Sequence, residues 1–302
     1  MFSDQHPFPP PLFSPGKKRS RFITSTRLLL SFVLTLGFGL SGCPGAERVP
    51  PPADLDGLVR YVWNEFENAN DTELMEAGAN AAAILEELLL AEDAKVGALE
   101  TLEVSDLATY GLDDGRDPAQ APGFFLASRF SCDLDVLADV LTHPNQGGVH
   151  PGVYDSYERD YAVSREDWLA ADFGRLSWRV DYEATPTATQ YQAHTESAIR
   201  RFDANGSLDG VRTLVQRTYL AEPATFAGNP DNHIFDQDYQ VDLFMQSADG
   251  EVLHLFGLWR HMQLGLVGIH DDVFVDFQIN GLVEWDQQTE AACATWPDFP
   301  SQ

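Results

Sequence analysis

The sequence predicts an α+β fold in which N-terminal helices precede an antiparallel β-meander that contains one inserted helix. Apolar side chains recur at helical spacing between residues 55 and 91, and from about residue 174 they alternate with polar ones. Turns that contain glycine, asparagine or aspartate separate the later apolar runs. Strands joined by such short turns pair antiparallel, because a parallel pair needs a long crossover. We therefore expect a curved sheet or half-barrel.

A helical segment is expected over residues 54–117. Its first apolar stripe has the spacing of one helix face and consists of Leu55, Leu58, Val59, Val62 and Phe66. Asp71 is typical of a helix N-cap and begins a second stripe that continues to about Ala91. A short third helix is expected to start at Ser105.

The α+β meander domain is expected over residues 118–302. It opens with a strand over residues 123–131. Asp133 then caps a helix that stops before Pro144, because the residue ahead of a proline disfavours the helical conformation. A loop rich in glycine, histidine and tyrosine is expected over residues 143–162.

Six further strands are expected to complete the meander. The first begins near residue 174, where polar side chains alternate with Leu176, Trp178, Val180 and Tyr182. The others are expected over residues 188–201, 211–221, 237–247, 251–266 and 272–285. Asp249-Gly250 is a two-residue hairpin signal, and Asn205-Gly206 and His270-Asp271-Asp272 are predicted turns. The chain would then end in a short segment that contains proline, residues 291–302.

The N-terminus has the pattern of an export signal. Basic residues from Lys17 to Arg27 precede an uncharged run of 13 residues, Leu28 to Leu40, which is too short for a spanning helix of about 20 residues. The run ends in Leu40-Ser41-Gly42-Cys43, which resembles the lipobox of bacterial lipoproteins. The Gly37–Gly42 segment also spells G-x-G-x-x-G, but it lies inside this run and predicts no dinucleotide cofactor.

The lipobox resemblance implies that residues 1–42 are a signal peptide and that Cys43 is the lipidated first residue of the mature protein. The lipid would be a diacylglycerol thioether with a further acyl chain such as palmitate, which anchors the protein permanently to the membrane of the cell envelope. Pro44 after the cysteine favours the outer membrane if the source is Gram-negative. Residues 43–53 would form a proline-rich stem. The alternative is an ordinary signal peptide with a chance cysteine.

The mature chain is strongly acidic. Without residues 1–42 it has 14 basic and 46 acidic residues, a net charge of −32. Such a chain repels nucleic acid. The charge fits an adaptation to saline surroundings, a contribution to solubility, or a site for divalent cations or a basic partner. The candidate cation loops are residues 113–117, 203–209 and 231–238.

Cysteine and histidine suggest few metal sites. Cys132 and Cys293 remain after Cys43 is lipidated, and an even pair in an oxidising compartment predicts a disulfide, with two free thiols as the alternative. His143 and His150 flank a flexible segment and are weak zinc candidates, although their spacing is not an established zinc motif. His254 and His261 are seven residues apart on one predicted strand and therefore point to opposite faces.

Catalytic residues cannot be assigned from the sequence. The mature chain has no G-x-S-x-G motif, and acyl transfer needs a nucleophile placed beside a base. Trp178, Trp259, Phe274 and Trp285 lie on predicted strands, either in the core or along an apolar cavity. Arg260 is either an anchor for an anionic head group or a surface arginine.

The order of strand, helix and meander over residues 120–285 is similar to that of helix-grip, START-like lipid-binding domains, and equally to half-barrel lipoprotein carriers. The first family closes with a long C-terminal helix. The resemblance implies a non-enzymatic envelope lipoprotein that binds an apolar or amphipathic ligand in the concavity of its sheet. The alternatives are a structural or interaction lipoprotein with a solid core, and a hydrolase. An apolar cavity would favour ligand binding, whereas convergent carboxylates or histidines with shifted pKa values would favour a hydrolase.

Overall fold

The computed structural model describes residues 49–302 except 113–114, 172–173, 187–188, 203–210, 229–230, 248, 266, 269–271, 297 and 299–302, and for residues 267–268 and 272–278 it describes the backbone only. Residues 49–302 form one compact unit. The expected signal peptide, the lipobox and Cys43 lie outside the described residues. No helix in the described part of the chain is long and apolar enough to cross a membrane.

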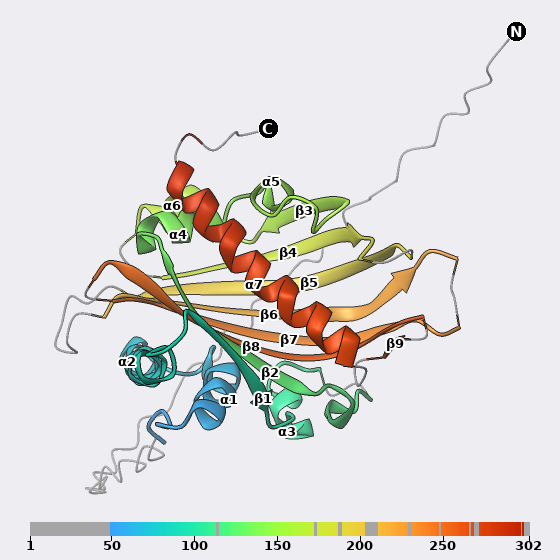
Figure 1. The fold of residues 1–302 in the computed structure, drawn as a ribbon, viewed down its shortest axis with the longest axis horizontal. Helices are drawn as coiled ribbons and strands as arrows, with labels where there is room; N and C mark the ends of the chain where they lie inside the picture. Colours follow the sequence, from blue (N-terminus) through green and yellow to red (C-terminus); the bar gives the residue numbers. More distant parts are fainter. Residues whose placement is uncertain are drawn as a thin grey trace, which may run out of the picture. The chain divides into compact units, whose positions relative to one another are not determined.

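The predicted α+β class is confirmed by a single curved antiparallel sheet with helices on both faces (Figure 1). The strand order is β1-β2-β8-β7-β6-β5-β4-β3, and β9 pairs with β8. The strands are β1 (Ala94–Leu99), β2 (Gly123–Ser131), β3 (Ser156–Tyr161), β4 (Gly174–Ala184), β5 (Tyr191–Phe202), β6 (Thr213–Phe226), β7 (Ile234–Gln246), β8 (Glu251–Leu264) and β9 (Val267–Gly268).

The helices form the outer layers. They are α1 (Leu55–Glu65), α2 (Asp71–Leu88), α3 (Val104–Ala108), the 3-10 turn η1 (Pro118–Gln120), α4 (Leu134–Leu141), α5 (Gln146–Val149), α6 (Arg165–Leu169) and α7 (Asp272–Thr295). Figure 1 shows α7 crossing one face of the sheet diagonally, while α1 and α2 lie at the other face. The sheet is therefore the middle layer, with apolar side chains on both of its faces.

The two faces of β8 show how the core divides. Leu255 and Trp259 point toward α1 and α2, where Trp259 and Tyr239 make edge contacts with Trp63. The alternate residues, such as His254, point toward α7. Because side chains alternate across a strand, β8 contributes to the core beneath α1 and α2 and to the layer between the sheet and α7.

Local signals position the helices. Asp54 accepts from the backbone of Gly57 at the start of α1. The cap of α2 is Asn70 rather than Asp71, because Asn70 and Glu73 form a reciprocal capping box. Asp133 caps α4 as predicted, and α3 starts one residue before Ser105.

The principal correction concerns residues 272–285, which were expected to form a strand and instead begin the long helix α7. The segment is rich in β-branched and aromatic residues, which favour a strand locally. After residue 285, however, the buried residues recur at helical spacing: Asp286, Thr289, Ala292 and Cys293. This stripe packs on the sheet. Phe274 and Trp285 therefore belong to a helix and not to a strand. The expected terminal segment, residues 291–302, begins with the last turns of α7.

Six other elements were not predicted: β1, η1, α5, β3, α6 and β9. The first strand and β3 are the two edges of the sheet. Strand β3 lies in the expected loop 143–162. Its inward positions include Arg159, which weakens the apolar pattern of a strand. The Asp249-Gly250 hairpin between β7 and β8 is confirmed, with Gly250 at a φ of 84°. The predicted turn at Asn205-Gly206 lies outside the described residues, as do the first two residues of the predicted turn His270-Asp271-Asp272, whereas Asp272 is the first residue of α7.

Candidate functional site

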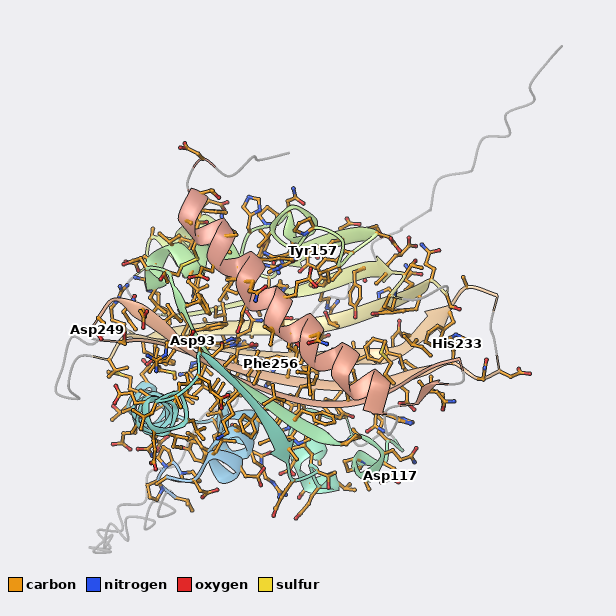
Figure 2. All side chains as sticks on the ribbon, viewed as in Figure 1. Asp93, Asp117, Tyr157, His233, Asp249 and Phe256 are labelled. Atoms are coloured by element: carbon orange, nitrogen blue, oxygen red, sulfur yellow. A yellow bond between two sulfur atoms is a disulfide. The ribbon has the colours of Figure 1, made fainter. Side chains whose placement is uncertain are left out.

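A cavity of about 660 Å³ lies between the concave face of the sheet and α7. Its walls come from β3 to β8, from the segment that precedes β3, and from residues 280–288 of α7. Tyr157 and Phe256, both labelled in Figure 2, line it. The predicted concavity is therefore present, and the helix that closes it is the element that sequence reasoning missed.

One wall of the cavity is aromatic. It is formed by Tyr154, Tyr157, Trp178, Tyr182 and Tyr191. The ring of Tyr182 makes edge contacts with those of Tyr154 and Tyr191, at 5.4 and 6.0 Å between centroids. Burial raises the pKa of all four tyrosines, so their hydroxyls remain neutral. This wall offers flat apolar surface with hydrogen-bonding hydroxyls along it.

The floor of the cavity is polar. Register places Ser197, Thr218 and Gln240 side by side on β5, β6 and β7, and the hydroxyls of the first two are 2.9 Å apart. Gln216 lies on the same face of β6, and its buried Oε1 has no hydrogen-bond partner among the described residues. An unpaired buried oxygen costs free energy, so a ligand that donates to it would be stabilised there.

Arg260 lines the cavity. This is the position that an anchor for an anionic head group would need, and a surface arginine would not be there. Arg260 Nη2 donates to Asp238 Oδ2 at 2.8 Å, and Gln240 Nε2 donates to both oxygens of the same carboxylate at 3.0 Å. The charge of Asp238 raises the pKa of Arg260 against the opposing effect of burial. Because this guanidinium already has a buried counter-charge, it is not a free anchor for an anionic group.

A histidine and two carboxylates meet beside the cavity. His254 Nδ1 lies 2.9 Å from Asp286 Oδ1 on α7, and its Nε2 lies 3.2 Å from Asp242 Oδ1 on β7. Burial lowers the pKa of His254, but the charge of Asp286 and the hydrogen bonds with both carboxylates outweigh it and raise the pKa to about 9. Burial also raises the pKa of Asp242.

Such convergence is what a hydrolase would require, but the arrangement does not supply one. The imidazole is protonated at neutral pH, and both nitrogens are engaged, so it cannot accept a proton from a nucleophile. The adjacent hydroxyl, that of Ser128, donates to Asp286 instead of to His254. The cluster is better described as an ion-paired clamp that holds α7 on the sheet.

The two weak zinc candidates are not brought together. His143 packs edge-on against Trp296. His150 stacks on Trp285, which precedes Trp296 by eleven residues, with 4.6 Å between the ring centroids. Burial and the positive charge of Arg159 lower the pKa of His150 to about 3.

The second histidine pair lies on β8. As the spacing indicated, His254 and His261 lie on opposite faces of β8, and His261 contacts Asp236. Across the described part of the chain, no group of three His, Cys, Asp or Glu side chains could hold a metal ion. Of the candidate cation loops, residues 203–209 and part of 113–117 lie outside the described residues. The third candidate, residues 231–238, is mostly strand, because β7 begins at Ile234.

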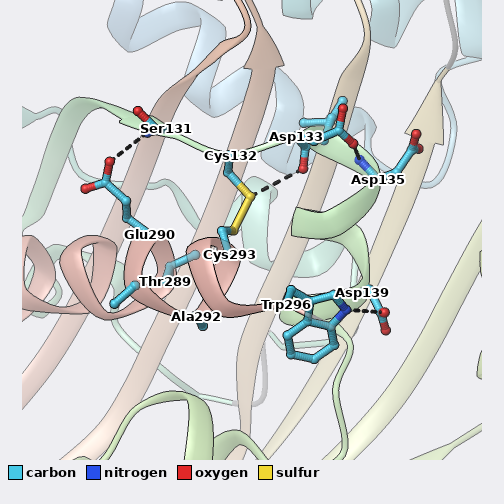
Figure 3. Close-up of a disulfide and its surroundings, with 12 residues drawn as sticks. Ser131, Cys132, Asp133, Asp135, Asp139, Thr289, Glu290, Ala292, Cys293 and Trp296 are labelled. Carbon is cyan, nitrogen blue, oxygen red and sulfur yellow. Dashed lines mark hydrogen bonds between the residues drawn. A yellow bond between two sulfur atoms is a disulfide. The ribbon is translucent and has the colours of Figure 1, made fainter. Parts of the chain in front are cut away.

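The predicted pairing of Cys132 with Cys293 is present, with 5.6 Å between the Cα atoms (Figure 3). It joins the segment before α4 to the last turns of α7, where the sequence predicted a short terminal segment. Close to it, Glu290 accepts from the backbone of Ser131, and Trp296 Nε1 donates to Asp139. The C-terminal part of α7 is thus attached at several points.

Comparison with known proteins gives only distant structural similarity. No family model and no curated protein matches the chain. A protein from Thermus thermophilus is similar at 10% identity and a TM-score of 0.39, over 57% of this chain and 97% of that one.

Two lipid-transfer proteins are similar at the same level. The STAR-related lipid transfer protein of Xanthomonas axonopodis gives 14% identity and a TM-score of 0.40, over 66% of this chain and 94% of that one. Human StAR-related lipid transfer protein 5 gives 9% identity and a TM-score of 0.40, over 75% and 97%. All three TM-scores are below 0.5, so these similarities do not indicate a function for this chain.

One feature of the sequence, which the predictions above did not include, indicates the cavity. Polar residues occupy inward positions of predicted strands, for example Ser197, Gln216 and Asp242. A sheet that packs on a solid core has apolar residues at such positions. A run of polar inward positions on neighbouring strands therefore indicates a cavity.

Proposed function

We propose that the protein is a membrane-anchored envelope lipoprotein that binds an amphipathic ligand between its sheet and α7. The observation that carries this proposal is the cavity of about 660 Å³, with its aromatic wall and polar floor. Its volume is within the range of small-molecule sites, about 300–1,000 Å³. A structural lipoprotein with a solid core would have no reason to retain buried polar groups around an open volume.

The composition of the lining selects an amphipathic ligand over a purely apolar one. The aromatic wall provides apolar contact area, whereas the floor presents Thr218, Gln240 and the unpaired Oε1 of Gln216. A hydrocarbon on this floor would leave the buried Oε1 of Gln216 without a partner, which costs about 1–3 kcal/mol. A ligand with hydrogen-bonding groups on one side avoids that cost.

Native mass spectrometry of residues 44–302, which contain the whole compact unit, tests the proposal. We expect a co-purified small molecule that is released on denaturation. Two variants should abolish it by filling the cavity from opposite sides. Gly281→Trp acts from α7, where an added Cβ meets no atom within 4 Å, and Thr218→Phe acts from the floor.

The control is Glu87→Trp, an exposed position on α2 at the other face of the sheet. This variant should retain the ligand, and all variants should show the melting behaviour of a folded protein. Protein that carries no adduct, and that binds no amphiphile when one is supplied, would contradict the proposal.

A further inference from the structure

Arg159 lies in the middle of β3, at the edge of the sheet. Along this strand Tyr157, Arg159 and Tyr161 are half-buried, whereas the alternate residues are exposed. Both Tyr157 and Arg159 line the cavity. The strand therefore directs one guanidinium toward the ligand space, between the aromatic wall and the C-terminal end of α4.

The groups that contact this guanidinium are neutral. Its Nε and Nη2 donate to the hydroxyl of Tyr157 at 2.9 and 2.6 Å, and its Nη1 donates to the carbonyl of Leu141 at 2.9 Å. Its Cζ lies 4.5 Å from the ring centroid of Trp178. The carbonyl at the end of α4 and the aromatic ring offset only part of a full positive charge.

Arg159 has no counter-ion among the described residues: no carboxylate oxygen there lies within 4.0 Å of its guanidinium. Arg260, the other arginine of the cavity lining, is paired with Asp238 at 2.8 Å. Acidic residues outnumber basic ones by 47 to 19 in this chain, so composition does not explain why Arg159 has no carboxylate partner among the described residues. A positive charge removed from water is costly unless an anion compensates it.

The remaining donors have the geometry of an anion site. A guanidinium has five N–H groups, of which three make the hydrogen bonds described above. The hydroxyl of Tyr161 is a further neutral hydrogen-bond partner of the guanidinium, so at least one N–H is left for an oxygen of a carboxylate, sulfate or phosphate. The charge is also felt within the cavity region, since it contributes to the lowered pKa of the nearby His150.

We propose that Arg159 binds the anionic head group of the ligand, so that the cavity takes an anionic amphiphile whose apolar part lies along the aromatic wall. This inference rests on the proposed ligand-binding function and specifies its ligand class. It also assigns the role of anchor, one of the two interpretations of Arg260 from the sequence, to Arg159, which has no carboxylate partner among the described residues.

Two probes of equal chain length test this inference: decanoate, which is anionic, and 1-decanol, which is neutral. Binding to residues 44–302 is followed by the fluorescence of Trp178 and Trp285, which line the cavity. We expect decanoate to bind at least about tenfold more tightly than 1-decanol. Arg159→Gln should remove this preference and leave the affinity for 1-decanol unchanged within about twofold. Arg159→Lys keeps the charge and should retain part of the preference.

The matched control is Arg179→Gln on the neighbouring strand, where the side chain is 78% exposed and paired with Glu196. It should bind both probes as the wild type does. Equal affinity of the wild type for the two probes, or equal losses in Arg159→Gln, would overturn the anion site and leave ligand binding intact. If neither probe binds the wild type, ligand binding itself fails and this inference with it.

Discussion

His254 joins three segments that are distant in the sequence. Its ring lies between Asp242 on the neighbouring strand and Asp286 on α7, and all three side chains are buried. The pKa of about 9 in the folded protein is above the ordinary value of 6.5. The folded state therefore binds this proton more tightly than the unfolded state, and the bound proton stabilises the fold.

The stabilisation from His254 is complete below pH 6.5 and is lost as the pH rises through about 9. We expect the melting temperature of the wild type to fall between pH 7 and 9.5. His254→Gln should melt at a lower temperature at pH 7 and show a flatter dependence over this interval. His261→Gln, on the opposite face of the strand, should keep the wild-type slope. A wild-type melting temperature that is constant across the interval would refute the clamp.

His150 has the opposite effect on the acid side. Its ring is fully buried, and its pKa of about 3 is below the ordinary value of 6.5. The stability that depends on its neutral form is present above pH 6.5 and is lost as the pH falls toward 3. The variant His150→Phe keeps a ring against Trp285 and should reduce the loss of melting temperature between pH 6 and 4. An unchanged acid slope in this variant would assign the loss to other groups.

At the scale of the elements, α7 decides whether the cavity exists, and the Cys132–Cys293 disulfide attaches its C-terminal part. The cysteines are 161 positions apart, for which chain-entropy models give about 5 kcal/mol as an upper bound. We expect Cys132→Ser/Cys293→Ser to lose up to this free energy of unfolding in denaturant titrations. Hydrogen exchange should quicken first in the C-terminal part of α7.

A reducing agent provides the control for the disulfide. It should lower the stability of the wild type and leave the double variant unchanged. Thiol counting on unreduced, denatured protein from the native envelope gives an independent result. Two reactive thiols there would show that the bond does not form in the cell.

At the scale of the whole molecule, the proposed attachment to the membrane would depend on one residue. The segment that resembles a lipobox ends at Cys43, and the described part of the chain has no helix that could span a membrane. We expect Cys43→Ala to move the protein from the membrane fraction to the soluble fraction and to abolish labelling by a palmitate analogue. Ser41→Ala keeps a small residue before the cysteine and should remain membrane-bound. Label retained on Cys43→Ala would disprove lipidation at this position.

Net charge also acts on the whole molecule. Without the predicted signal peptide, residues 1–42, the chain has a net charge of −32, and the structure places like charges side by side, as for Glu158 and Asp181 on β3 and β4. The folded chain holds its charges closer together than the unfolded chain, so self-repulsion opposes folding. The Debye length falls from about 30 Å at 0.01 M salt to about 3 Å at 1 M, and screening removes most of this repulsion.

Sodium chloride should therefore raise the melting temperature markedly between 0.01 and 1 M. Chloride is the suitable anion, because sulfate also strengthens hydrophobic burial. A flat response would contradict the adaptation to saline surroundings. A full shift produced by millimolar calcium, but not by magnesium at equal ionic strength, would indicate a specific site in the acidic loops.

The sequence by itself determined the features that depend on local chemistry. The export signal and the lipobox are predictions from ordered local motifs, the acidity is a property of composition, and the cysteine pair follows from counting. The α+β class, the first two helices and most meander strands follow from periodicity, because one face of each element must be buried. Edge strands such as β3 were missed, since their polar inward residues obscure the alternation.

Only the tertiary structure decided the identity of α7 and, with it, the site. The residues from 272 to 285 fit a strand locally, and their helical continuation through Asp286 and Cys293 becomes favourable only once a concave sheet exists to pack against. The meeting of Asp286 with His254, and the absence of a carboxylate near Arg159 among the described residues, are likewise relations between distant segments. Local periodicity cannot encode them, because their free energy arises from burial in a space that no single segment encloses.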